Sequence, residues 1–292
     1  MRAVTLLKSA GIALLLAGAV HLLHAAGADS VIVRQDIAYS ERDSGRTRLD
    51  LYLPAGGGVN RPGVLLIHGG GWQGGNKSQW AGLARVLVSR GFVCASAGYR
   101  LAPEHRFPAA ISDVRLAMDF FKSRAAEYGI NPQRIGAVGS SAGGHLVALL
   151  STIDPEDRLG DPEGQITRDT RPQAVACYNP VLDFTNEPLI WSSTLRFLGV
   201  PPEGNERTYY ESSPALRVKG EEPPFLFLYG SRDILTPEPK SRAMISRLAG
   251  SGIPVEVAFF HGMEHGFGYS LRLPEQIRAA HVVADFFERW LK

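Results

Sequence analysis

Residues 134–150 read RIGAVGSSAGGHLVALL, and the order of residues in this segment points to one kind of fold. Its composition predicts a strand over 134–138 and a helix over 142–150. Between the two lies the pattern G-x-S-x-G, with Ser141 at its centre. A turn this sharp requires small residues two positions to either side of the central serine. The register centred on Ser140 would place valine and alanine there, so we expect Ser141 to be the exposed hydroxyl and Ser140 a packing residue.

The rest of the chain alternates strands and helices. Apolar or alternating runs predict two strands within 31–54 and further strands at 63–68, 92–99, 174–181, 224–230 and 255–260. Helical spacing predicts helices at 77–90, 107–128, 237–248 and 273–291. We expect a polar loop over 154–171 and an irregular insertion over 183–219 that is able to form a partial cap. The pattern favours one α/β domain with a mostly parallel central sheet flanked by helices.

The N-terminus has the features of a secretory signal. Two basic residues precede an apolar run over 10–23 that contains no Asp, Glu, Lys or Arg, and AGA at 26–28 fits a cleavage site. About 14 apolar residues are short for a membrane span, which needs roughly 20. We therefore predict a signal peptide over 1–28, a catalytic domain over 29–292, and a secreted or periplasmic mature protein.

The charge balance argues against several partners. Removing Arg2 and Lys8 leaves 29 basic residues, from 31, against 29 acidic ones, and no basic run of five exists. Nucleic acid and anionic membrane surfaces are therefore poor candidate partners. We also expect no stable membrane insertion after signal cleavage.

A second glycine-rich segment, HGGGWQGG, follows the strand predicted at 63–68. It matches the dinucleotide-binding pattern G-x-G-x-x-G, which also needs a carboxylate about 20 residues later. No Asp or Glu occurs between Leu51 and Pro103. The segment instead favours the HGGG turn, whose exposed backbone amides stabilise a developing oxyanion. In that interpretation His68 braces the turn and is not a base.

A serine hydroxyl needs a base, and the base needs an orienting carboxylate. After a nucleophile on this kind of turn, the acid comes next in the chain and the histidine last. Asp233 lies just past the strand predicted at 224–230, and His265 lies past the strand at 255–260. Both sit at the carboxyl ends of strands, where α/β sheets place their chemistry.

Other residues compete for these roles. His145 lies four positions after Ser141, on a helix face that we expect to be buried, and His261 is the alternative base. Asp183 and Glu264 are alternative acids. HGMEH at 261–265 has the H-x-x-x-H spacing of a zinc site but lies on a glycine-rich loop instead of a helix. We therefore expect no metal and no cofactor.

Five segments together resemble the α/β-hydrolase esterases: HGGGW, YRLAPEHRFPAAISDV, GSSAGGH, GSRDILTP and HGMEHGFG. The pattern is most similar to the bacterial acetyl-xylan and feruloyl-esterase-like (BD-FAE-like) group, which is related to the hormone-sensitive-lipase group. The resemblance covers the chain from about Val31 onward. It implies Ser141 as nucleophile, Asp233 as orienting acid and His265 as base. It also implies that the backbone amides of Gly70, Gly71 and Ala142 form the oxyanion hole.

Two departures favour the carbohydrate-esterase-like branch over lipases. The hormone-sensitive-lipase group usually has an acidic residue where this chain has Ser140. That group also carries an N-terminal helical cap, whereas here the first predicted strand follows the cleavage site almost directly.

The family's strand order also bears on the two cysteines, Cys94 and Cys177. It implies two other strands between theirs, which is about 14 Å at roughly 4.8 Å per strand. A disulfide cannot span that distance. We predict two free, buried thiols.

The sequence therefore predicts a serine carboxylic-ester hydrolase that acts on acetylated carbohydrate or other short-chain esters. Trp72 and Trp191 are candidate pocket residues, although both fit ordinary packing equally well. Two alternatives remain: a peptidase of the prolyl-oligopeptidase type, and a non-catalytic binding protein built on the same fold. The first usually carries a propeller domain, and the second typically loses members of the triad.

Overall fold

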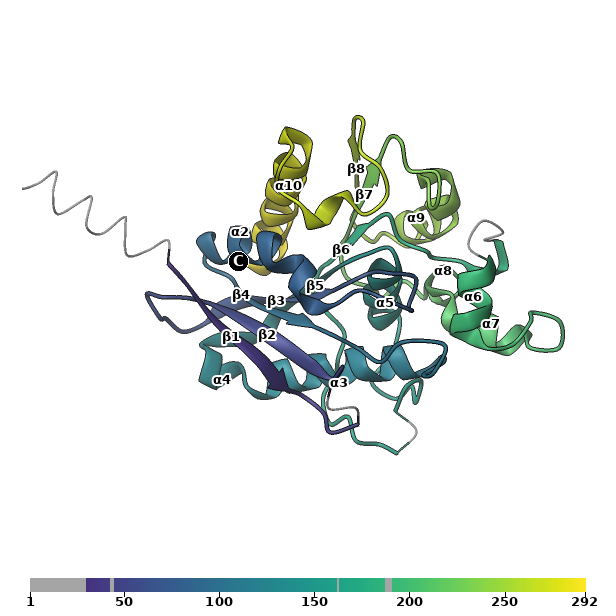
Figure 1. The fold of residues 1–292 in the computed structure, drawn as a ribbon, viewed down its shortest axis with the longest axis horizontal. Helices are drawn as coiled ribbons and strands as arrows, with labels where there is room; N and C mark the ends of the chain where they lie inside the picture. Colours follow the sequence, from purple (N-terminus) through teal and green to yellow (C-terminus); the bar gives the residue numbers. More distant parts are fainter. Residues whose placement is uncertain (1–29, 43–44, 162, 187–190) are drawn as a thin grey trace, which may run out of the picture.

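A single twisted sheet forms the centre of the protein (Figure 1). The computed structural model describes residues 30–42, 45–161, 163–186 and 191–292, so the predicted signal peptide lies outside the described residues. Within them, eight strands pair in the order β1-β2-β4-β3-β5-β6-β7-β8. Their bounds are β1 Val31–Ala38, β2 Arg48–Pro54, β3 Arg61–Ile67, β4 Val93–Ala97, β5 Ile130–Ser140, β6 Val175–Tyr178, β7 Phe225–Gly230 and β8 Val255–Phe260.

Strands β3 to β8 are parallel to one another, whereas β2 is antiparallel to both of its neighbours, β1 and β4. A short polar turn joins β1 to β2, as the sequence predicts, and short turns produce antiparallel pairs. Residues 55–60 alone link β2 to β3, which points opposite to β2, whereas each later connection contains a helix, so β3 to β8 point the same way. Their carboxyl ends therefore meet at one edge of the sheet, where the loops bearing the candidate site residues begin.

Helices cover both faces of the sheet (Figure 1). One core lies between the sheet and helices α2 and α10, and the other lies between the sheet and helices α3, α5 and α9. The helices are α2 Ala81–Ser89, α3 Ala109–Ser123, α4 Ala125–Tyr128, α5 Ala142–Ser151, α6 Trp191–Leu198, α7 Glu206–Ser212, α8 Pro214–Arg217, α9 Arg242–Gly250 and α10 Pro274–Leu291, with short 3-10 turns η1 Lys77–Trp80, η2 Phe184–Asn186, η4 Glu238–Ser241 and η5 Phe267–Tyr269. Both faces of the central strands are therefore buried, which explains why these strands are continuously apolar in sequence.

Three sequence-based expectations need correction. The helix predicted over 107–128 begins two residues later and is interrupted at Arg124, giving α3 and α4. The strand predicted over 134–138 is longer, because Arg61 on β3 also pairs with Ile130. The segment 183–219 is not irregular: it contains α6, α7 and α8, whose buried residues include Phe197 and Tyr209. These helices lie together beside the carboxyl edge of the sheet (Figure 1).

The cysteines lie where the resemblance implies. Cys94 is on β4 and Cys177 is on β6, with β3 and β5 between them. The two side chains belong to the cores on opposite faces of the sheet, and both thiols are free and buried. The strand order on which that expectation depended is confirmed.

Candidate active site

The turn between β5 and α5 holds Ser141 in a strained backbone conformation. Its φ is 56° and its ψ is −119°, a region that non-glycine residues rarely occupy. A Cβ on Gly139 would lie 2.2 Å from the carbonyl oxygen of Gly143, and a Cβ on Gly143 would lie 2.1 Å from the carbonyl oxygen of Ile67. The sequence predicts small residues at both flanking positions of the G-x-S-x-G pattern, and the packing admits only glycine there.

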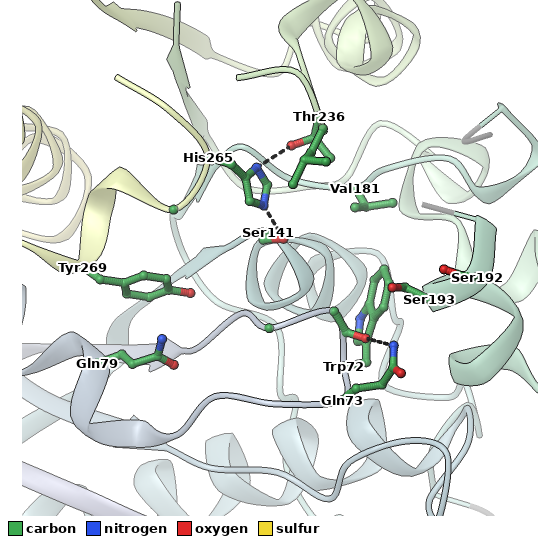
Figure 2. A pocket seen from close by; sticks show the side chains of 14 residues that line it. Trp72, Gln73, Gln79, Ser141, Val181, Ser192, Ser193, Thr236, His265 and Tyr269 are labelled. Carbon is green, nitrogen blue, oxygen red and sulfur yellow. Dashed lines mark hydrogen bonds between the residues drawn. The ribbon is translucent and has the colours of Figure 1, made fainter. Parts of the chain in front are cut away.

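Three side chains that are distant in sequence meet at this turn. His265 Nε2 lies 2.8 Å from Ser141 Oγ, and His265 Nδ1 lies 2.7 Å from Asp233 Oδ2. Because an ionised carboxylate only accepts hydrogen bonds, Nδ1 carries the proton and Nε2 is free to accept from the serine hydroxyl. The structure thus brings together the three residues that the sequence singled out, in the order serine, imidazole, carboxylate (Figure 2 shows the first two).

Asp233 is buried and well supplied with donors. Its Oδ1 accepts the backbone N–H groups of Leu235 at 2.8 Å and Thr236 at 3.0 Å. Burial raises the pKa of this carboxyl, but the hydrogen bond and charge of His265 and the two backbone donors outweigh burial, and the net pKa is lowered. Asp233 is therefore ionised where His265 needs an acceptor.

The turn after β3 faces the serine. Gly70 has φ 112° and Gly71 has φ 60°, and both line the pocket that contains Ser141 and His265. Ala142, the first residue of α5, is buried directly after Ser141. Among the described residues, the N–H groups of these three have no hydrogen-bond acceptor. The first residues of a helix leave such donors free by construction.

His68 is a structural residue, as predicted. It is buried, its Nδ1 lies 2.8 Å from the carbonyl oxygen of Gly69, and its ring stacks on Tyr99 at 4.4 Å. The Tyr99 hydroxyl donates to the His68 carbonyl at 3.0 Å. The neighbouring Arg100 holds the buried Asp113 through two guanidinium donors. Tyr99 therefore holds the start of the glycine turn in place through its contacts with His68.

A pocket of about 570 Å³ opens over these residues. Its remaining wall includes Val181, Ser192, Ser193 and Leu235. Trp72 also lines it, but the side chain is only 1% exposed and stacks on Phe197 at 4.5 Å, so it is chiefly a core residue. The side chain of the other predicted pocket residue, Trp191, lies outside what the structure describes.

The alternative bases and acids take no part in this contact network. His145 is buried, accepts the indole N–H of Trp72 at 3.1 Å and donates to the Ser212 carbonyl at 2.8 Å. Burial lowers its pKa to about 4, so it is neutral. His261 and Glu264 are exposed, and Asp183 accepts from the Thr185 backbone N–H instead. His145 is thus the buried, hydrogen-bonded residue that the sequence predicted.

Sequence reasoning missed two polar side chains at the site. The Thr236 hydroxyl lies 3.3 Å from His265 Nδ1 and donates to the Asn179 carbonyl at 2.9 Å. The Tyr269 hydroxyl accepts the Gly69 N–H at 2.5 Å. Thr236 lies within the segment GSRDILTP and Tyr269 directly follows HGMEHGFG, but neither pattern assigns the residue a role. Their positions, three after Asp233 and four after His265, were the available signal.

The described residues contain no group of three or more His, Cys, Asp or Glu side chains placed to hold a metal ion. They also contain no helix that combines the length and the apolar character needed to cross a membrane.

The sheet order, the strained serine turn, and the acid and histidine after β7 and β8 define the α/β-hydrolase fold. A truncated carbohydrate esterase from gut microbiota shares this fold, with a TM-score of 0.77 at 23% identity over 89% of this chain and 96% of that one. The profile of the BD-FAE family matches residues 49–248, and the chain belongs to that family.

Individual relatives agree with this membership. The chain is 34% identical to the probable carboxylic ester hydrolase LipM of Mycobacterium tuberculosis over 230 residues, which are 75% of this chain and 52% of LipM. It is 34% identical to the esterase LipC of the same organism over 70% of this chain and 53% of LipC. It thus spans about half the length of these curated relatives. An esterase from Thermogutta terrifontis, solved with propionate bound, is 27% identical with a TM-score of 0.72, covering 88% of this chain and 93% of that one.

Proposed function

We propose that this protein is a serine carboxylic-ester hydrolase in which Ser141, His265 and Asp233 form a catalytic triad. The observation that carries the proposal is the unbroken hydrogen-bonded series from Ser141 Oγ through the imidazole to the buried carboxylate. A serine hydroxyl is inert until a base accepts its proton, and this arrangement supplies a base in the correct tautomer.

The proposed reaction has two halves. Ser141 Oγ attacks the ester carbonyl while His265 Nε2 takes the hydroxyl proton, and the oxyanion forms beside the amides of Gly70, Gly71 and Ala142. His265 then protonates the departing alcohol and leaves an acyl-serine. Water, deprotonated by the same nitrogen, attacks the acyl-serine, and the imidazolium returns this proton to Ser141 Oγ as the acid leaves. No step requires a metal or cofactor, and the buried Asp233 stabilises the imidazolium throughout.

We further propose short-chain esters as the substrate class, with acetylated carbohydrate first among them. A pocket of about 570 Å³ suits a small ligand. The Thermogutta terrifontis relative was solved with propionate bound, and the polar side chains of Gln73, Gln79 and Ser193 line the same pocket. Release of acetate from acetylated xylan would support carbohydrate as the alcohol portion. Activity confined to long-chain triglycerides would contradict the proposal.

A p-nitrophenyl ester series of increasing acyl length, run with the wild type and Ser141→Ala, tests the function directly. We expect the highest kcat/KM at short acyl chains, in line with the propionate bound to the Thermogutta terrifontis relative. We also expect a loss of at least about 10⁴-fold in kcat for Ser141→Ala, because the nucleophile is gone. Ser140→Ala is the matched control and should retain most of the activity. Comparable loss in both variants, or no hydrolysis by the wild type, would refute the proposal.

We also propose that residues 1–28 are a signal peptide and that the mature enzyme acts in the periplasm or outside the cell. The support is the basic start, apolar run and small-residue exit of the sequence. N-terminal sequencing of the exported protein should begin near residue 29. A cell-associated chain that retains residue 1 would contradict this.

A further inference from the structure

Tyr269 connects the two backbone segments that the proposed reaction must keep aligned. It lies on η5, four residues after His265, and its hydroxyl oxygen accepts the Gly69 N–H at 2.5 Å. Gly69 immediately precedes Gly70 and Gly71, which line the pocket. One hydrogen bond therefore joins the histidine loop to the glycine turn.

The ring of Tyr269 is itself held firmly. It packs edge-on against Trp80 at 4.8 Å, and Trp80 is fully buried. Trp80 in turn contacts Tyr178, which packs against Phe267 of η5 at 5.3 Å. An aromatic ring fixed on several sides directs its hydroxyl to one point. Figure 2 shows this ring in the pocket wall, on the side of Ser141 away from Ser192 and Ser193.

The atoms around Gly69 leave little space for the backbone of the turn to move. A Cβ at this position would lie 2.5 Å from the Ser140 carbonyl oxygen, 2.8 Å from the Tyr269 hydroxyl and 3.1 Å from Ser141 Cβ. The Gly69 amide, the phenol and the serine are thus packed within one small region. A shift of the phenol is transmitted to the segment that carries the oxyanion amides.

We propose that Tyr269 is a positioning residue: its hydroxyl sets the distance between the Gly70–Gly71 amides and the Ser141–His265 pair. The inference rests on the proposed ester hydrolysis. Oxyanion donors act only when they are held at hydrogen-bond distance from the charge that develops in the transition state. Misplacing catalytic groups by a fraction of an ångström to 1 Å costs up to about 10²-fold in rate.

Tyr269→Phe tests the proposal, because it removes the hydroxyl and keeps the ring packed against Trp80. With p-nitrophenyl acetate we expect kcat to fall about tenfold while KM changes less than threefold. A boronic-acid inhibitor that forms a tetrahedral adduct with Ser141 should bind about tenfold more weakly, in parallel with kcat/KM. A lower kcat and weaker boronate binding, with little change in KM, are expected when the lost interaction is made only in the transition state.

The pH profile and the thermal stability of Tyr269→Phe separate this role from two others. If Tyr269 acts through the glycine turn, the acidic limb of kcat/KM should keep its midpoint in Tyr269→Phe and lose only amplitude. A displaced midpoint would mean that the residue acts through His265 and would overturn the proposal. A lower thermal midpoint with unchanged kcat and unchanged boronate affinity would show a merely structural role and would also overturn it.

Tyr210→Phe is the matched control, since Tyr210 is 50% exposed on α7 and does not line the pocket. It should match the wild type in every assay. A wild type that hydrolyses no ester would refute the proposed function itself. A wild type that does so, with Tyr269→Phe equally active, would refute only the role of Tyr269.

Discussion

The buried carboxylate of Asp233 determines which nitrogen of His265 carries the proton. This carboxylate accepts from His265 Nδ1 and from two backbone N–H groups. Charge-assisted hydrogen bonds of this kind are shorter and stronger than neutral ones. The Nδ1 proton is thereby held on the side away from Ser141, and the lone pair of Nε2 faces the serine hydroxyl.

Replacing Asp233 with Asn should reduce kcat by about 10⁴-fold, because the amide N–H₂ group favours the tautomer with its proton on Nε2. KM and folding should change little, since Asn has the same shape. The measurement is p-nitrophenyl acetate hydrolysis together with circular dichroism. Glu264→Gln, a neighbouring exposed carboxylate, is the control and should remain active. An equal loss of kcat in Asp233→Asn and Glu264→Gln would show that Asp233 is not the residue that orients His265.

At the scale of elements, the strand-turn-helix unit of β5 and α5 combines strain with tight packing. Ser141 occupies a positive φ, and its N–H donates to the Tyr178 carbonyl on β6 at 2.8 Å. The first turns of α5 approach β3 so closely that Gly143 almost touches the Ile67 backbone. The strain is tolerated because neighbouring strands hold both sides of the turn.

Gly143→Ala should therefore destabilise the protein by about 3 kcal/mol and abolish most activity, because backbone atoms cannot move away from the new methyl group. Gly250→Ala is the control: it is the last residue of α9, and a Cβ there meets no atom within 4 Å. That substitution should stabilise the protein by roughly 0.5 kcal/mol. Urea denaturation of both variants measures the difference. A tolerated Gly143→Ala would contradict the packing described for the turn.

The elements differ in how far sequence predicts them, for physical reasons. Buried parallel strands such as β3 and β7 are continuous apolar runs between turn residues, so their positions are predictable. The break at Arg124 carries no glycine or proline, and nothing local marks it. Helices α6, α7 and α8 have at most eight residues, which is too short for an apolar period to be recognised with certainty in the sequence.

The same contrast holds within the site. Ser141, Asp233 and His265 are predictable because each follows a recognisable strand and their order along the chain is characteristic. Tyr269 and Thr236 contribute through contacts that depend on the final placement of loops. Such contacts join residues far apart in sequence, here 200 positions for Gly69 and Tyr269, and no local pattern encodes them.

At the scale of the whole molecule, two buried histidines link folding to pH. Burial lowers the pKa of both His68 and His145 from 6.5 to about 4. Between these values the unfolded chain binds protons that the folded chain excludes, so stability is complete above pH 6.5 and falls as the pH decreases toward 4. The loss from pH 7 to pH 5 is about 2 kcal/mol for each histidine.

Urea denaturation at pH 7 and pH 5 measures this dependence. His145→Gln should lower stability at both pH values because the contacts with Trp72 and Ser212 change, yet the difference between the two pH values should shrink by about half of the histidine contribution. A free energy of unfolding that does not change over this range would show that these imidazoles accept protons in the native state.

The two thiols give a means of observing each face of the sheet separately. Cys94 lies in the core on the face that α2 and α10 cover, whereas Cys177 lies in the core on the face that α3, α5 and α9 cover. Burial raises the pKa of both thiols well above the usual range, so neither reacts with an alkylating reagent while its covering layer stays in place. In the variants Cys94→Ala and Cys177→Ala, the labelling rate of the remaining thiol would report how often one helical layer detaches. Equal rates would mean that both layers open in one cooperative event, and unequal rates would identify the layer that detaches first.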